Sequence, residues 1–381
     1  MKTTSKPRIA LMSYSMDNRP GMGTALYTRR LVEQLLLDDR FEWYLVHYDR
    51  VDDPLYARAH EIVMPAVNLP VGTHFVRQLL FFWRHRKEQF DIIHWFQPRL
   101  YPFFWLAPGR HFIATLHGAG DITSPGAFPP SRRMFNFVLR HFHQKLDAII
   151  AVSKFGKEEI EECYGAAPER VFVTYPGGGT RFPYLSPEDA RAKVVATYDL
   201  TEPYILDVAR LESHKNVGAL VRAYLLARDR GITHKLVLVG RDAGLYGELK
   251  QLANSSPYGA DILFTLQTDD ATLHALYASA DLFVFPSFNE SFGLPVVEAM
   301  SQHVPVITSN VTALPEIVGD GGIVVDPTSP AEIASAIVRV LSDPEFKREL
   351  AARGGERAKI FEWKNTAVQT LDLYARVLRG V

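Results

Sequence analysis

The sequence has little cysteine and no long apolar run. Cys163 is the single cysteine among 381 residues, so no disulfide can form within the chain. Disulfides are typical of secreted proteins, and their absence favours a reducing cytoplasm as the location. No stretch approaches the roughly 18 uninterrupted apolar residues of a membrane-spanning helix, and residues 1–16 lack the apolar core of a secretory signal. We therefore expect any membrane contact to be peripheral, at the inner face of the membrane.

The sequence also lacks an excess of charge and the common metal motifs. Its 42 Lys and Arg balance 43 Asp and Glu, which leaves a net charge of -1 and no global field that would attract nucleic acid. It contains no Cys/His cluster, no Asp-x-Asp at a strand end and no His-Glu-x-x-His, so we expect no metal site and no bound cofactor. A Walker loop and a Gly-x-Ser-x-Gly nucleophile elbow are absent as well.

Two successive sets of short apolar runs are present, each alternating with segments of helical period. This alternation predicts an α/β protein with two Rossmann-like, doubly wound parallel-sheet domains that face each other across a cleft. Residues 182–203 have the composition of an interdomain linker. We expect an N-terminal domain over 1–185, a second domain over 200–362, and a C-terminal helix over 363–381 that reaches back to the first domain. The predicted strands are 8–14, 42–47, 91–95, 111–117, 148–153 and 171–175, then 204–209, 235–240, 261–265, 282–286, 304–308 and 322–326.

The strongest motif comes directly after the run 282–286. This position favours a binding site, because doubly wound sheets bind ligands at the carboxyl ends of their strands. Glu290 lies in the predicted loop, and Glu298 lies on a helix that begins near Gly293 or Leu294. The free N–H groups at that helix N-terminus suit a phosphate. Eight residues of helix would separate the two carboxylates by about 12 Å, so they are expected to hold two ends of one ligand. The alternative is a surface helix whose acid only complements the helix dipole.

Two cations follow the run 204–209. Arg210 offers a planar fork and Lys215 a compact charge, both near the start of a helix predicted over 217–228. Together they would stabilise a departing diphosphate. The alternative is that they pair with Asp207 or Glu212 at the surface.

In the first half, glycines and a histidine follow two strands. Gly21 and Gly23 stand where backbone N–H groups could approach a phosphate or sugar, and His117 stands where it could bond a sugar hydroxyl. The full dinucleotide fingerprint is missing, which disfavours a nicotinamide dehydrogenase. His117 could instead be a turn histidine without a catalytic role.

An aromatic and basic stretch over 75–105 has two interpretations. It mixes large apolar side chains with Arg77, Arg84, Arg86 and Lys87. Such a pattern fits a helix on a membrane surface or a lipid-acceptor groove. It also fits a core helix with a solvated basic end.

Taken together, these motifs resemble family 4 of the retaining glycosyltransferases, enzymes of the GT-B fold. The resemblance spans nearly the whole chain and is densest from 209 to 327. Glu290 and Glu298 match the family's Glu-x7-Glu motif, and Arg210 and Lys215 match its Arg-x4-Lys pair. His117 aligns with the family's active-site histidine.

The resemblance implies that the domain over 1–185 binds the acceptor and the domain over 200–362 binds the nucleotide sugar. It also implies a role for each of these residues. Glu298 would bind the ribose and Glu290 the donor sugar, while backbone groups of the loop and helix start hold phosphate and sugar. Arg210 and Lys215 would neutralise the diphosphate without a metal, and His117 would complete the site from the other domain. The implied reaction moves a hexose, from GDP-mannose or next a UDP-hexose, to a glycan, lipid-linked or small-molecule acceptor. The helix-start residues concerned are Ser291, Phe292, Gly293 and Leu294, and the glycine loop is Gly21 to Gly23.

Two other functions remain open on the sequence alone. A nucleotide-sugar epimerase of the same fold would act without an acceptor. A catalytically inactive protein could bind a nucleotide sugar as the partner of an active subunit, although it would not need the two cations that stabilise a leaving group.

Overall fold

The computed structural model describes residues 6–17, 23–97, 100–119, 130–178, 182 and 185–380. The chain forms two compact units. Unit 1 consists of residues 1–176 together with 363–381, and unit 2 consists of residues 177–362. None of the helices in the described ranges is long and apolar enough to cross a membrane.

Unit 1 is built on a seven-stranded sheet in which every pair of neighbours is parallel. The strand order is β3-β2-β1-β4-β5-β6-β7, so the order reverses between β1 and β4. Six of these strands were predicted from the sequence, while the edge strand β3 was missed. The strands are β1 (Arg8–Met12), β2 (Glu42–His47), β3 (His60–Val63), β4 (Phe90–Trp95), β5 (Gly109–Leu116), β6 (Ala148–Ala151) and β7 (Val171–Val173).

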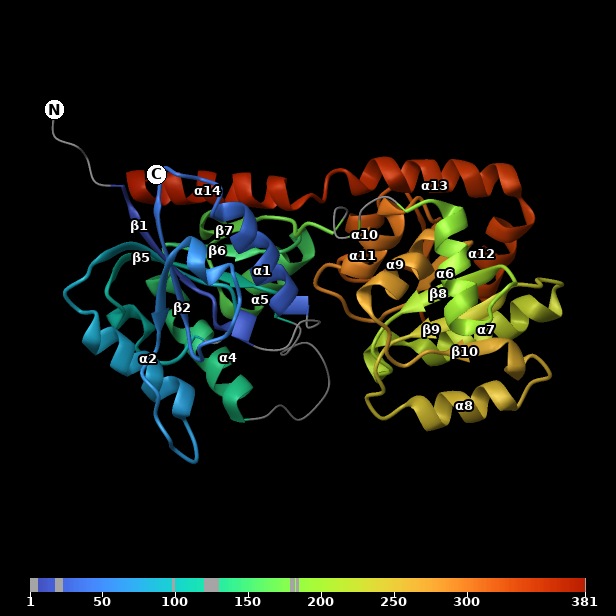
Figure 1. Ribbon diagram of the computed structural model, residues 1–381, viewed down its shortest axis with the longest axis horizontal. Helices are drawn as coiled ribbons and strands as arrows, with labels where there is room; N and C mark the ends of the chain where they lie inside the picture. Colours follow the sequence, from blue (N-terminus) through green and yellow to red (C-terminus); the bar gives the residue numbers. More distant parts are fainter. Residues whose placement is uncertain are drawn as a thin grey trace. The chain divides into compact units, whose positions relative to one another are not determined.

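The helices of unit 1 include the C-terminal helix, which packs against α1 and β4 (Figure 1). Its Tyr374 hydroxyl lies 2.6 Å from Nδ1 of His94 on β4, and Nε2 of His94 lies 2.9 Å from the Thr115 hydroxyl on β5. A fully buried polar chain therefore joins the last helix to the middle of the sheet. The helices are α1 (Gly23–Leu35), α2 (Thr73–Arg84), α4 (Pro130–Phe142), α5 (Lys154–Tyr164) and α14 (Trp363–Arg379).

Helix α2 shows that part of the stretch 75–105 belongs to the core. Phe81 and Phe82 are buried in the core, and Arg77 is buried as well. The Arg77 guanidinium donates to the carbonyl oxygens of Met64 (3.1 Å) and Pro65 (3.0 Å), which explains how a cation is accommodated there. The inner face of α2 is thus core, while Trp83 remains 65% exposed.

Unit 2 contains a six-stranded parallel sheet with the order β10-β9-β8-β11-β12-β13. This is the strand order of the Rossmann fold, with its reversal between β8 and β11. The prediction of two doubly wound parallel sheets is confirmed. The strands are β8 (Tyr204–Val208), β9 (Lys235–Val239), β10 (Ile262–Phe264), β11 (Leu282–Phe285), β12 (Val306–Ser309) and β13 (Ile323–Val325), and all six were predicted.

Helices connect the strands of unit 2, and α7 and α12 lie side by side. Five of the unit 2 helices begin with proline in the first turn, where its missing N–H costs nothing. The helices are α6 (Pro187–Tyr198), α7 (Val217–Asp229), α8 (Tyr246–Asn254), α9 (Asp270–Ala278), α10 (Leu294–Ser301), α11 (Leu314–Val318), α12 (Pro330–Ser342) and α13 (Pro344–Ala358).

The prediction that residues 182–203 form a linker was wrong for most of that segment. Helix α6 occupies it and packs against α9 within unit 2. The Ser186 hydroxyl accepts from the Asp189 N–H and caps the helix, and Asp199 ends it in the left-handed conformation. The Ser-Pro start with acids in the first turn is a helix signal that was outweighed by the polar composition.

Candidate functional site

The predicted site residues of unit 2 follow two strands that are neighbours in the sheet. The sheet order reverses between β8 and β11, and a doubly wound sheet offers its ligand crevice outside the carboxyl ends of the strands at such a point. Arg210 and Lys215 follow β8, and Glu290 follows β11. The fold therefore places both loops at one edge.

Lys215 and Glu290 are in direct contact. Lys215 Nζ lies 2.5 Å from Glu290 Oε1, and the two side chains are only 16% and 13% exposed. The Lys215 ammonium also lies 5.7 Å from the centroid of the Phe285 ring. A cation and an anion are thus held together in a partly desolvated position, where charges act more strongly than in water.

A set of hydrogen bonds locks the two loops together. Phe288 N–H and the Ser287 hydroxyl both donate to the carbonyl of His214, at 2.8 and 3.0 Å. The Asn216 amide donates to the carbonyls of Pro286 (3.0 Å) and Pro327 (2.7 Å). Because Asn216 is the residue after Lys215, these bonds fix where the lysine lies. Neither Asn216 nor Ser287 was predicted from the sequence as a site residue, although asparagine at a helix start is a recognisable signal.

Arg210 makes a different contact from Lys215. Its side chain is 64% exposed, and Nη1 lies 3.5 Å from Glu212 Oε2. Glu212 also contacts His214, with 3.4 Å between Oε1 and Nε2. The surface pairing considered from the sequence is therefore present for Arg210, whereas Lys215 makes the contact with Glu290.

The start of α10 requires glycine. Gly293 precedes the helix with φ of 107°, in the left-handed region, and a Cβ added there would lie 2.8 Å from Leu314 Cδ2. Among the described residues, no side chain caps this helix start, in contrast to α5, α6, α9, α12 and α13. The backbone N–H of Leu294 is therefore not bonded by a capping side chain, which suits an anionic ligand. Phe292, just before it, is buried against Phe361.

The backbone of Glu290 is held from the β12–α11 connection. Glu290 N–H donates to the Thr312 hydroxyl (3.2 Å), and Ala313 N–H donates to the Glu290 carbonyl (3.3 Å). Thr312 has φ of 58°, which is unusual for a β-branched residue and is a form of backbone strain often found at functional sites. Further along, Glu298 is 2% exposed within α10, and Ser291 belongs to the same loop as Glu290.

The chain after β9 runs against the chain after β8. A Cβ on Gly240, whose φ is 155°, would lie 1.7 Å from the carbonyl oxygen of Ala209. No side chain fits there. Glycine at position 240 thus allows the backbone beside Arg210 to pass close to the next loop. This role of Gly240 was not predicted from the sequence.

In unit 1, the structure places His117 directly after β5. Its Nε2 donates to the Phe96 carbonyl (3.3 Å), and its ring lies edge-on to Tyr27 at 4.9 Å. Burial lowers the pKa of His117 to about 4, so the ring is neutral near pH 7. A neutral imidazole has one donor and one acceptor nitrogen.

The glycine loop is described only in part. Gly23 is the first residue of α1, and a Cβ added to it meets nothing within 4 Å. Among the described residues there is thus no steric reason for glycine at this position. Gly21 lies outside the described residues.

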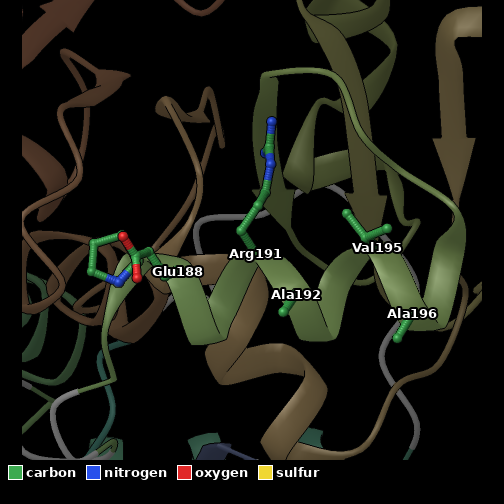
Figure 2. Close-up of a pocket in the computed structure, with 6 residues that line it drawn as sticks. Glu188, Arg191, Ala192, Val195 and Ala196 are labelled. Carbon is green, nitrogen blue, oxygen red and sulfur yellow. The ribbon is translucent and has the colours of Figure 1, made fainter.

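Other site types find little support in the described ranges. They contain no group of three or more His, Cys, Asp or Glu side chains placed to hold a metal ion. A hollow in the surface of unit 2 is lined by α6 alone, as Figure 2 shows for Glu188, Arg191 and Val195. It contains none of the predicted site residues.

Each half of the chain matches a known protein family. The family described as "Glycosyltransferase Family 4" matches residues 22–178, and the family described as "Glycosyl transferases group 1" matches residues 190–359.

Among curated proteins, the chain is similar to mannosyltransferases of Escherichia coli. It is 34% identical over 267 residues to O-antigen chain mannosyltransferase B, a match that covers 69% of each chain. It is 32% identical over 258 residues to the serotype-specific mannosyltransferase WbdA, covering 66% of this chain but only 31% of that protein. It is also 33% identical over 249 residues to D-inositol 3-phosphate glycosyltransferase of Nocardioides, covering 60% of this chain and 54% of that protein.

Solved structures of similar fold cover nearly the whole chain. HepE of Anabaena, solved with UDP and glucose, has a TM-score of 0.77 at 20% identity and covers 97% of this chain and 99% of its own. Sucrose-phosphate synthase of Thermosynechococcus elongatus has a TM-score of 0.72 at 23% identity and covers 98% of this chain and 100% of its own. At these identities the likeness concerns the fold.

Proposed function

Because the chain belongs to the group 1 glycosyl transferases, with a family 4 N-terminal half, we propose that it transfers a hexose from a nucleotide sugar to an acceptor hydroxyl, with retention of configuration and without a metal. The observation that carries the proposal is the contact between Lys215 and Glu290 at the carboxyl ends of β8 and β11. The contact supports the proposal because a cation that could hold a diphosphate lies next to a carboxylate that could bond a sugar hydroxyl.

In the proposed mechanism, the protein stabilises the charge that develops on the leaving group. As the bond between the sugar and the diphosphate breaks, negative charge grows on the phosphate oxygens, and Lys215 together with the uncapped start of α10 offsets it. Arg210 is exposed, so it is free to turn toward the same phosphates. Glu290 accepts hydrogen bonds from donor-sugar hydroxyls, Glu298 binds the ribose, and His117 bonds a sugar hydroxyl. The donor phosphate takes the acceptor's proton.

We propose GDP-mannose as the donor, with a UDP-hexose as the next candidate. The support for mannose is the similarity to two curated mannosyltransferases, while the HepE structure contains UDP and glucose. A thermal-shift screen with GDP, UDP, ADP and their sugars tests this choice. A rise in melting temperature confined to guanine nucleotides supports the proposal, and a rise confined to uridine nucleotides contradicts it.

The acceptor is proposed to be a glycan or a lipid-linked sugar. An epimerase or an inactive binding partner would differ in one measurable respect. Sugar transfer from the donor should occur only when an acceptor is added. Conversion of the donor sugar without any acceptor would indicate an epimerase, and tight donor binding without turnover for any acceptor would indicate a binding partner.

We also propose peripheral contact of unit 1 with an anionic membrane surface at the cytoplasmic face. Four large apolar side chains are exposed between 49% and 65%, namely Trp83, Phe103, Leu106 and Phe137. Phe103 contacts Trp105, which in turn contacts Phe142 of α4, and Arg86 lies over the Trp83 ring. Exposed aromatic rings with arginines nearby suit the interface of an anionic bilayer.

A further inference from the structure

Asp207 is a buried carboxyl group without a side-chain hydrogen-bond partner among the described residues. It is the fourth residue of β8 and is 1% exposed, and the only hydrogen-bonding group that acts on its carboxyl is the backbone N–H of the next residue, Val208. The strand register places it opposite Leu238 of β9, and its neighbour Leu206 is fully buried. Buried polar groups are nearly always well hydrogen-bonded, so a carboxyl without a side-chain partner in an apolar sheet requires an explanation.

The charged groups that act on Asp207 are the two that make up the candidate donor site. Burial raises the pKa of Asp207 to about 8, Lys215 opposes this rise, and Glu290 adds to it. Lys215 comes from the turn after β8 and Glu290 from the loop after β11, whereas β9 presents the apolar Leu238. Lys215, which contacts Glu290, thus also acts electrostatically on the Asp207 carboxyl.

This electrostatic interaction matters for a ligand that also needs the lysine. If Asp207 were ionised, its charge would repel a diphosphate bound beside Lys215 and would draw the ammonium toward the sheet. If it were protonated, the ammonium would be shared only between Glu290 and the phosphates. A dianion placed nearby raises the pKa of a carboxyl group, so ligand binding itself favours the protonated form.

We propose that Asp207 is a positioning residue of the donor site, which takes up one proton when a nucleoside diphosphate binds beside Lys215. The inference rests on the proposed function. The proton comes from solvent, forms an O–H bond on the Asp207 carboxyl and returns to solvent when the nucleotide leaves, with no other bond made or broken. Asp207 acts through Lys215 and does not itself touch the donor.

The test is the pH dependence of nucleotide binding. Calorimetric titrations with GDP, UDP and ADP are made from pH 7 to 9.5, each in two buffers of different ionisation enthalpy, for wild type, Asp207→Asn and Asp207→Leu. For the nucleotide that binds, wild type should show net proton uptake above pH 8 and an affinity that falls by up to tenfold per pH unit. Both variants should lose the uptake and show a flatter profile. The control Asp281→Asn, at the amino end of neighbouring β11, should retain the wild-type profile.

Stability separates this role from a structural one. Removing a buried carboxyl without a side-chain partner should leave the melting temperature of Asp207→Leu equal to or above that of wild type. Its advantage should grow from pH 5 to 8, because the folded protein keeps a proton on Asp207 that the unfolded chain releases near pH 4.

Three outcomes overturn the inference. The first is the same pH slope of affinity in wild type and Asp207→Asn. The second is a fall in the melting temperature of Asp207→Leu, which would make the carboxyl structural. The third is that wild type binds none of the three nucleotides at any pH. Only this third outcome also contradicts the proposed function, so a failure of the inference can be told apart from a failure of the proposed function.

Discussion

Lys215 and Glu290 are 75 positions apart in the sequence, and their side chains meet at 2.5 Å beside the carboxyl end of β11. One contact thus joins two of the motifs that were predicted from the sequence. The hydrogen bonds of Asn216 to the carbonyls of Pro286 and Pro327 keep the lysine-bearing turn in place. The contact is therefore a fixed feature of unit 2, and variants on either side of it should report on activity.

Replacing either predicted cation should reduce transfer far more than stability. Because one fixed charge at a developing anion contributes about 100-fold to 1,000-fold in rate, we expect Lys215→Ala to lose at least about 100-fold in kcat. The variant leaves Glu290 unpaired, which should cost about 1–3 kcal/mol of unfolding free energy. Arg210→Ala, at an exposed position, should reduce transfer with a stability change within about 0.5 kcal/mol.

The matched control is Lys359→Ala, which removes another ion-paired lysine of unit 2 at an exposed position. It should leave transfer and melting temperature unchanged. Full turnover by Lys215→Ala or Arg210→Ala would show that the residue concerned has no part in the reaction.

Gly293→Ala should impair both folding and donor binding. The new methyl group would lie 2.8 Å from Leu314 Cδ2 in a left-handed backbone conformation, and such strain costs about 1–3 kcal/mol. Gly247→Ala in α8 is the control, since its Cβ meets nothing within 4 Å and its backbone carries no positive φ. Chemical denaturation and nucleotide titration of both variants check this prediction. Equal stability of the two would rule out the steric requirement at Gly293.

Acid should destabilise unit 1 through His94. Burial lowers the pKa of His94 to about 3, so between pH 3 and 6.5 the folded protein binds fewer protons than the unfolded chain. Stability should therefore rise with pH in this window, by up to about 1.4 kcal/mol per pH unit for this group. Urea unfolding of wild type and His94→Gln should show a weaker slope in the variant. His141→Gln, at an exposed position, should behave as wild type, and an unchanged slope in His94→Gln would exclude this residue as the cause.

Transfer should persist in a chelator. In the proposed mechanism the leaving group is neutralised by side chains and a helix start, so excess EDTA should change the initial rate by less than about twofold, a difference of about 0.4 kcal/mol in the barrier. The measurement is the rate of nucleoside diphosphate release with acceptor present. Strict dependence on added Mg²⁺ or Mn²⁺ would refute the metal-free account.

Membrane contact should depend on the exposed aromatic side chains of unit 1. We expect wild type to sediment with phosphatidylglycerol vesicles more than with neutral phosphatidylcholine vesicles, because the Arg86 guanidinium lies over the exposed Trp83 ring. Trp83→Ser together with Phe137→Ser should reduce this binding several-fold. Val368→Ser, which replaces an exposed apolar residue of α14, is the control. Equal sedimentation of all three proteins would show that Trp83 and Phe137 do not take part in membrane binding.

Most of the architecture could be predicted from the sequence, because the patterns that specify strands and helices are local. Buried strands of a parallel sheet are continuous apolar runs, so 12 of the 13 strands were recognisable. The exception, β3, is a four-residue edge strand with exposed His60 and Glu61, and it lacks that signal. Helix α6 was missed for a similar reason, since its composition is that of a linker and its start signal lies in Ser186 and Pro187.

Only the tertiary structure decided which side chains of the motifs meet. The neighbouring positions of β8 and β11 follow from how the apolar faces of the whole sheet pack, and no local pattern encodes them. The directions of the side chains after those strands depend on distant partners: Asn216 bonds a carbonyl 111 residues away, which holds Lys215 against Glu290, while Arg210 pairs with Glu212. The burial of Asp207 without a side-chain partner is likewise invisible in the sequence, because it depends on every described residue that surrounds the carboxyl group.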